Sequence, residues 1–170
     1  FKMRFPEGKD RAVTLSYDDG CDQDLRMLEI LDKYGMKCTV NLNGEEFSPN
    51  VYTKEVAEER IYKKGHEIAV HGLLHKSLGK IRPVEGIREI LDCRLELERK
   101  FGRIIKGLAY AGYGIRMMSQ NVTYDEIRSY LSSLGISYAR TLGGDNNLFE
   151  LPKDWYAWMP TAHHNNPKLM

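Results

Sequence analysis

The sequence predicts an α/β protein built on a mostly parallel sheet, which is either open or closed into a barrel. Three observations predict this class. Short apolar runs rich in β-branched residues alternate with longer segments that have helical periodicity. Each strand is therefore followed by a crossover helix, which makes neighbouring strands parallel. With 170 residues, of which 42% are hydrophobic, the chain is long enough to bury a core.

The first half of the chain alternates strand and helix. Residues 11–17 contain the apolar and β-branched side chains of a buried strand. The next segment predicts a helix that is capped by Asp22 or Asp24 and runs to Tyr34, where Gly35 ends it. The other elements expected in this half are a strand at residues 37–42, an amphipathic helix at 54–64 and a strand at 67–71.

The second half continues the alternation and adds strands at its end. Pro83 begins a long helix that runs to about Phe101, because proline is tolerated in the first turn of a helix. A second helix at residues 124–134 ends at Gly135. The expected strands lie at residues 104–110 and 136–141, with shorter ones at 148–151 and 155–161, which makes about seven strands in the chain.

Composition and charge exclude several classes of function. The net charge is +1, so no basic surface for nucleic acid or for an anionic membrane is indicated. No apolar run has the length of a transmembrane helix. The three cysteines are widely spaced and fit neither a disulfide framework nor a cysteine-rich zinc site. The chain shows no signal peptide, which is compatible with a cytoplasmic protein or with a secreted or cell-envelope protein whose signal was removed.

Two adjacent carboxylates, Asp18 and Asp19, end the first expected strand and are followed by Gly20. Ligands and chemistry sit at the carboxyl ends of strands in α/β sheets. Neighbouring side chains on a strand point to opposite faces, but the chain turns at a strand end, so both carboxylates can face one cavity. The alternative is an ordinary Asp-Asp-Gly turn.

A pair of histidines follows the third expected strand. His71 and His75 are four residues apart, a spacing that places two imidazoles on one side of a helical turn. Because the carboxyl ends of parallel strands open on one rim, an aspartate and these histidines can form a site for zinc, cobalt, manganese or iron(II). The alternative is a loop with two solvated histidines. His66 precedes its strand, so we expect it on the opposite rim in a structural role.

Two more segments follow strands on the same rim. His163 and His164 end the last expected strand, where alternation lets only one of them face inward as an acid or base. The alternative is a histidine pair near a disordered C-terminus. Tyr113 lies in a glycine-rich turn, where a ligand can approach the main chain and N–H groups can hold an oxyanion. An ordinary glycine turn is the alternative.

Two of these motifs together resemble those of the polysaccharide deacetylase family, which is the NodB-homology family or carbohydrate esterase family 4. Asp18-Asp19-Gly20 resembles the first family motif, and residues 70–78 resemble the second. The resemblance extends over residues 11–164. It implies a distorted (β/α) barrel with fewer than eight regular units, and a single catalytic domain over residues 1–170.

The resemblance also implies roles for the residues of both motifs. Asp18 matches the catalytic base of the family. Asp19, His71 and His75 match the ligands of a divalent metal ion. Zinc is the ion favoured for this site, with Co²⁺, Mn²⁺, Fe²⁺ and Ni²⁺ as alternatives.

The remaining roles fall on the later motifs. The main-chain N–H of Tyr113 matches the oxyanion donor, and His163 or His164 matches the general acid. The third family motif usually carries an arginine, which orients the base, and a proline before its Tyr-Gly. Here residues 110–112 are Tyr, Ala and Gly, so that arginine is absent from the motif.

The function implied by the resemblance is the metal-dependent removal of acetyl groups from an N- or O-acetylated carbohydrate. Two other functions stay open. The same residues could hydrolyse a non-sugar amide or imide, or the chain could be a glycan-binding domain of the same fold without turnover.

Overall fold

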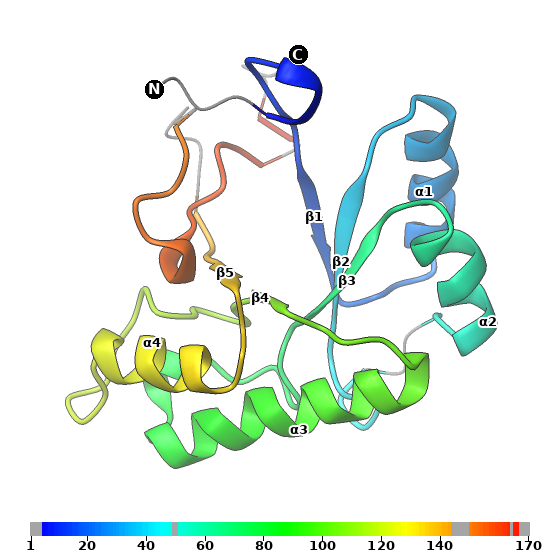
Figure 1. The fold of residues 1–170 in the computed structure, drawn as a ribbon. Helices are drawn as coiled ribbons and strands as arrows, with labels where there is room; N and C mark the ends of the chain where they lie inside the picture. Colours follow the sequence, from blue (N-terminus) through cyan, green and yellow to red (C-terminus); the bar gives the residue numbers. More distant parts are fainter. Residues whose placement is uncertain (1–4, 49–50, 144–149, 164, 167–170) are drawn as a thin grey trace.

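The structure is a computed structural model that describes residues 5–48, 51–143, 150–163 and 165–166. Five parallel strands form one sheet whose spatial order is also the order along the chain (Figure 1). Each crossover moves one position in the same direction, as in a barrel and unlike a doubly wound sheet, where the order reverses. The strands are β1 (Leu15–Asp18), β2 (Cys38–Leu42), β3 (Glu67–Val70), β4 (Gly107–Ala109) and β5 (Tyr138–Arg140).

In the described part of the chain, four α-helices cover one side of this sheet (Figure 1). The longest, α3, has a proline in its first turn and ends at Gly102, whose φ of 68° is the left-handed conformation that favours glycine. No helix among the described residues is both long and apolar enough to cross a membrane. The helices are α1 (Gln23–Lys33), α2 (Lys54–Ala57), α3 (Pro83–Phe101) and α4 (Tyr124–Ser133), and a π-helical turn at Glu58–Tyr62 continues α2.

The side of the sheet that faces the helices is the hydrophobic core. Alternate residues of the strands point to this side and pack against the apolar stripes of α1, α3 and α4. Each fully buried side chain of this size contributes roughly 1.5–3 kcal/mol. The buried members include Leu28, Val40, Leu42, Ile68, Val70, Ile90, Leu97, Leu108, Ile127 and Leu131.

The opposite, inner side of the sheet carries polar side chains. Tyr138 on β5 donates to the Glu67 carboxylate on β3 at 2.8 Å. Arg140 on β5 donates from Nε to the Ser16 hydroxyl on β1 at 3.0 Å. Because β1 and β5 stand at the two ends of the strand order, this contact requires a sheet that curls until its first and last strands face one another. The architecture is therefore a curled half-barrel.

The observed fold confirms the predicted class, a parallel α/β sheet that is a distorted barrel, but the described residues form fewer strands than expected. The long helix lies at the predicted residues 83–101. The strand expected at 155–161 is wrong: Trp155–Ala157 is a 3-10 turn, and Trp158 makes only one isolated bridge to the sheet. Pro160 has no N–H to extend that ladder. The strand expected at 148–151 lies partly outside the described residues.

Candidate metal centre

The two carboxylates at the end of β1 approach the same imidazole although they are adjacent in sequence. Asp18 is the last residue of the strand, and Asp19 follows with a φ of 78°. This left-handed backbone, which aspartate tolerates better than most residues, turns the second carboxylate toward the imidazole that the first also approaches. Nε2 of His71 lies 3.9 Å from Oδ2 of Asp18 and 3.6 Å from Oδ1 of Asp19.

His71 follows β3 and is buried, with one ring nitrogen held by the main chain. Its Nδ1 lies 2.9 Å from the carbonyl oxygen of Ala109 at the end of β4. A carbonyl only accepts hydrogen bonds, so Nδ1 carries the proton and Nε2 keeps a lone pair for a ligand. Burial lowers the pKa of His71, against the opposing effect of the Asp18 carboxylate, and so favours the neutral form that binds metals.

His75 completes the group from a loop whose backbone is unusual. Its φ is 56°, and among the described non-glycine residues only Glu7, Asp19 and His75 have positive φ. The Phe47 ring stacks on its imidazole with centroids 5.2 Å apart and planes 5° apart. Nε2 of His75 lies 3.8 Å from Oδ1 of Asp19. Sparsely populated backbone conformations tend to gather at functional sites, as they do at these two residues.

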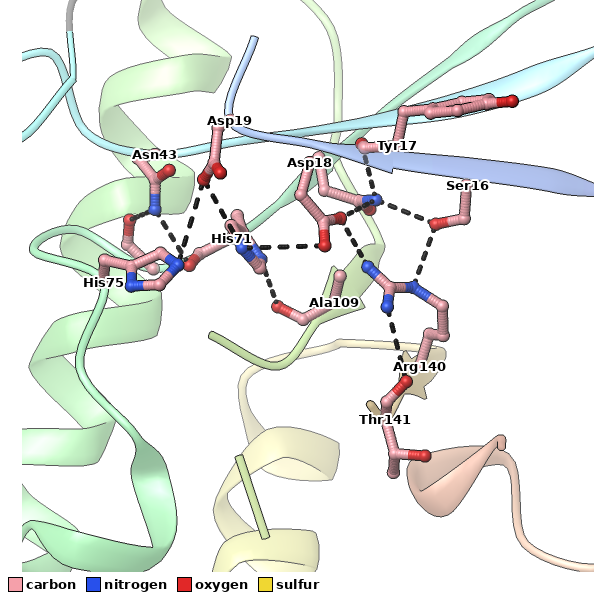
Figure 2. A network of polar contacts seen from close by, with 12 residues as sticks. Ser16, Tyr17, Asp18, Asp19, Asn43, His71, His75, Ala109, Arg140 and Thr141 are labelled. Atoms are coloured by element: carbon pink, nitrogen blue, oxygen red, sulfur yellow. Dashed lines mark hydrogen bonds and ion pairs between the residues drawn. The ribbon is translucent and has the colours of Figure 1, made fainter. Parts of the chain in front are cut away.

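These three side chains fit a divalent metal ion. One ligand atom from each of Asp19, His71 and His75 lies within 4.8 Å of the others (Figure 2). Two ligands of a tetrahedral zinc ion, bound at about 2.0–2.2 Å, are separated by roughly 3.4 Å, so a small contraction would bring the group to bonding geometry. Three nitrogen and oxygen ligands would leave one position open, as catalytic zinc sites do.

Asp18 is held differently, through one of its two oxygens. Asn41 on β2 donates from Nδ2 to Oδ1 of Asp18 at 2.9 Å. Arg140 pairs with the same oxygen through Nη2 (Figure 2). The Arg140 side chain is only 13% exposed. The second oxygen, Oδ2, is the one nearer His71. The carboxylate is therefore fixed by one oxygen, while the other faces the cluster of Asp19, His71 and His75.

Arg140 and Asn41 were missed at the sequence level. The arginine expected before Tyr113 is indeed absent there, but an arginine from β5 contacts Asp18 instead. Each of these side chains lies within a predicted apolar strand, where a polar residue has to be explained by an acceptor or donor on the inner side of the sheet. A polar residue in an apolar strand was therefore the available signal. Sequence spacing could not identify Asp18 as the partner of Arg140, because the two are 122 positions apart.

The expected oxyanion donor is already engaged. The N–H of Tyr113 donates to the Ser77 hydroxyl at 2.9 Å, and Ser77 lies two residues after His75. The ring of Tyr113 is 57% exposed, and Nζ of Lys80 lies 4.3 Å from its centroid. The turn that contains Tyr113 therefore lies beside the loop that carries His75. A more strongly charged oxygen could replace the Ser77 hydroxyl as the acceptor of the Tyr113 N–H.

His163 is not at a strand end. His163 lies in an irregular segment, its side chain is exposed, and its Nδ1 accepts the N–H of Asn165 at 3.2 Å. The alternation argument is wrong for His163 for this reason, because alternation applies only to extended strands. His164 lies outside the described residues, and the role of a general acid stays a prediction for both.

His66 lies at the opposite end of β3, as expected for a structural histidine. It is buried, accepts the N–H of Cys38 at 3.1 Å and contacts Oδ1 of Asp32 on α1 at 3.1 Å. The ring thus joins β2, β3 and α1 at the end of the sheet away from Asp19, His71 and His75.

Comparison with known proteins places this geometry in a family context. A family model described as polysaccharide deacetylase matches residues 6–139, which is more than half of the chain. Among solved structures, the Streptococcus pyogenes deacetylase PplD in complex with acetate superposes with a TM-score of 0.68 at 21% identity. That match covers 83% of this chain and 59% of the other, so the chain spans less than two thirds of that protein.

Two further structures share the fold. A family 4 acetyl xylan esterase from Clostridium thermocellum in complex with a cobalt ion has a TM-score of 0.54 at 19% identity, over 80% of this chain and 60% of the other. A wild-type CE4 family pseudoenzyme from Bacillus anthracis has a TM-score of 0.56 at 16% identity, over 76% of this chain and 43% of the other. At these identities, the similarity establishes the fold alone.

Proposed function

Because the chain belongs to the polysaccharide deacetylase family, we propose that it is a metal-dependent hydrolase that removes acetyl groups from an N- or O-acetylated carbohydrate. The observation that carries the proposal is the oriented carboxylate of Asp18 beside the cluster of Asp19, His71 and His75. A base next to a three-ligand metal site is what hydrolysis by an activated water requires. We take residues 1–170 as one catalytic domain.

In this proposal, Asp19, His71 and His75 hold the metal ion, with zinc favoured by their nitrogen and oxygen donors. The neutral ring of His71, whose Nδ1 is bound to Ala109, presents Nε2 without having to lose a proton first. A bound divalent ion would supply Lewis acidity, which polarises the acetyl carbonyl and makes a water molecule more acidic.

Asp18 is the base. Its Oδ2 takes the proton from water as the water oxygen attacks the acetyl carbon, while Asn41 and Arg140 keep Oδ1 in place. The N–H of Tyr113 donates to the developing oxyanion after exchanging its Ser77 acceptor for the more strongly charged oxygen. Asp18 lies next to His71, and the N–H of Tyr113 is bound to Ser77, two residues after His75.

His163 or His164 protonates the leaving nitrogen or oxygen as the bond to the acetyl carbon breaks, and we favour His163. His163→Ala should lower kcat roughly a hundredfold at unchanged metal content, the usual scale of a lost general acid, while His164→Ala should be mild. The opposite ranking would assign the acid to His164. Wild-type rates in both variants would remove the histidine pair from the mechanism.

The proposed function is tested by acetate release. The purified protein should release acetate from acetylated oligosaccharides, lose this activity with a chelator and regain it with Zn²⁺ or Co²⁺. A set of small non-sugar amides and imides is the substrate control, and Asp18→Asn is the matched variant. Faster turnover of a non-sugar amide than of acetylated oligosaccharides would show that non-sugar amides are the substrate class.

A second candidate function, glycan binding without turnover, is supported by one observation. The N–H that should hold the oxyanion is engaged with Ser77. Binding of acetylated oligosaccharides by calorimetry, without acetate release at any metal loading, would establish this function. Chelator-sensitive acetate release would exclude it.

A further inference from the structure

The loop that carries His75 is folded around a buried carboxylate. Glu89 lies on α3 and is only 3% exposed. Its Oε1 accepts the N–H of Leu74 at 2.8 Å and the N–H of Lys76 at 3.0 Å. The main-chain oxygen of Glu89 also accepts the N–H of Leu73 at 2.9 Å. Three main-chain N–H groups of the histidine loop, residues 72–77, therefore donate to one residue of α3.

A charge at this position of α3 needs a physical explanation. Burying a carboxylate is costly unless hydrogen bonds compensate it, and an apolar side chain would fill a helix–sheet contact at lower cost. The hydrogen bonds that the structure gives Glu89 come from the loop main chain, not from the core. The carboxylate is therefore used to fix the loop and not merely to fill space.

The glycine in this loop is explained by the same residue. Gly72 has a φ of 96°, and a Cβ placed there would lie 2.8 Å from Oε1 of Glu89. Such a contact is too short for any side chain, so the loop can close on the carboxylate only with glycine next to His71. The glycine at position 72 is therefore required by the position of the Glu89 carboxylate.

The two side-chain hydrogen bonds enclose His75. The donors Leu74 and Lys76 are its neighbours on either side, so both flanking peptides are tied to one oxygen atom. Between them, His75 has its left-handed φ of 56°. The Phe47 ring stacks on the imidazole. Glu89 thus fixes the backbone and Phe47 the ring.

We propose that Glu89 is a positioning residue for the metal site, which holds His75 where its Nε2 meets Asp19 and His71. The inference rests on the proposed function, in which these three residues bind a divalent ion. Loss of a group that supports a ligand typically weakens metal binding about ten- to a hundredfold. Glu89 acts through His75 and does not touch the ion.

The test measures metal binding alone, without substrate. Metal-free wild-type protein and the variants Glu89→Ala and Glu89→Gln are titrated with Co²⁺, whose visible absorption reports the ligand geometry. Glu89→Ala should weaken Co²⁺ binding about ten- to a hundredfold and change the spectrum. Glu89→Gln keeps an acceptor oxygen and should lose less. Equal affinity and an unchanged spectrum in a folded Glu89→Ala protein would overturn the inference.

Glu98→Ala is the matched control. Glu98 lies on the same helix, and its Oε1 accepts the N–H of Ile105 at 2.8 Å and Nε of Arg94 at 2.8 Å, away from the histidine loop. This variant should lower stability and leave Co²⁺ affinity unchanged. An equal loss of affinity in Glu98→Ala would show a general effect of destabilising α3 and would overturn the assignment.

A second measurement keeps the test valid if Glu89→Ala does not fold. Glu89→Gln is compared in the wild-type and His75→Ala backgrounds. If Glu89 acts through His75, its effect on Co²⁺ affinity should largely disappear when His75 is absent. An equal effect in both backgrounds would overturn the inference. Absence of Co²⁺ binding by the wild-type protein would instead refute the proposed metal site itself.

Discussion

Two buried histidines flank β3, and their rings are used in opposite ways. At the amino end, Nδ1 of His66 accepts the N–H of Cys38, so Nε2 carries the proton and donates to Asp32. At the carboxyl end, Nδ1 of His71 donates to the carbonyl of Ala109, so Nε2 is the free nitrogen. Both tautomers are assigned from the partners of the rings.

The difference teaches that burial does not distinguish a structural histidine from a candidate ligand. What distinguishes them is whether the main chain offers the ring a donor or an acceptor. A donor at Nδ1 leaves His66 with its proton on the other nitrogen, which completes a network inside the fold. An acceptor at Nδ1 leaves His71 with a lone pair directed at carboxylates. Substitution of His71 should therefore affect function, and substitution of His66 should affect stability.

The largest effect is expected for His71→Ala. This variant should weaken Zn²⁺ or Co²⁺ binding by more than about a hundredfold, since losing a ligand exceeds the loss of a group that supports one. Affinity is measured by competition titration of the metal-free protein, and circular dichroism checks the fold. Stoichiometric metal in this variant by mass spectrometry would show that His71 is not a ligand.

Asp18→Asn is expected to have the next largest effect, this time on turnover. Asparagine has the same shape but cannot take a proton from water, so kcat should fall by at least about a hundredfold. Metal content should stay at the wild-type level, because Asp18 is not one of the proposed ligands. Wild-type turnover with metal bound would mean that the roles of Asp18 and Asp19 are exchanged.

Arg140→Ala should have a smaller effect on the same step. With the ion pair gone, Asp18 retains the hydrogen bond from Asn41 but can rotate, so kcat should fall about ten- to a hundredfold at unchanged KM and metal content. Added guanidinium should restore part of the rate. Arg140→Lys should recover less than wild type, because lysine lacks the planar fork. A wild-type kcat in the alanine variant would show that Asn41 alone orients the base.

At the amino end, His66→Ala should change stability only. Removing the ring leaves the N–H of Cys38 and a carboxylate oxygen of Asp32 without this partner, which costs about 1–3 kcal/mol per buried group. The free energy of unfolding is measured by denaturant titration, and metal affinity is the control. A folded His66→Ala protein that no longer binds metal would break the distinction between the two ends of β3.

The smallest effect is a pH dependence in the metal-free protein. Burial lowers the pKa of His71 in the folded state. As pH falls below the ordinary histidine value of about 6.5, the unfolded chain takes up a proton that the folded protein does not. This contribution to stability is therefore present above that pH and lost as pH falls. His71→Gln should flatten the slope of unfolding free energy against pH, and an unchanged slope would contradict the shift.

Much of the fold could be predicted because its signals are local. Pro83 begins α3, and the helix ends at Phe101 as expected. The alternation of apolar segments predicted the parallel sheet. Strand ends were less certain, since the ladder covers Gly107–Ala109 where residues 104–110 were expected. Pairing with a neighbour, which no local pattern contains, decides where a strand stops.

The site residues also divide into those that local sequence signals predict and those that only folding brings together. The proximity of Asp19, His71 and His75 could be predicted from their positions after strands, and the three side chains do lie together; their binding of a metal stays a prediction. Arg140 and Glu89 could not be identified, since each acts on a residue brought near only by folding. The placement of His163 at a strand end was wrong, because that expectation assumed a regular strand where the chain makes a turn.

The left-handed backbone at Asp19 and His75 has a consequence for how such a protein can change over evolutionary time. Asparagine, aspartate and glycine enter this conformation at low cost, whereas valine and isoleucine do so only with strain. A descendant released from selection for the metal should therefore drift toward Asn or Gly at these two positions. The left-handed backbone would continue to restrict which residues are accepted at these positions after metal binding had been lost.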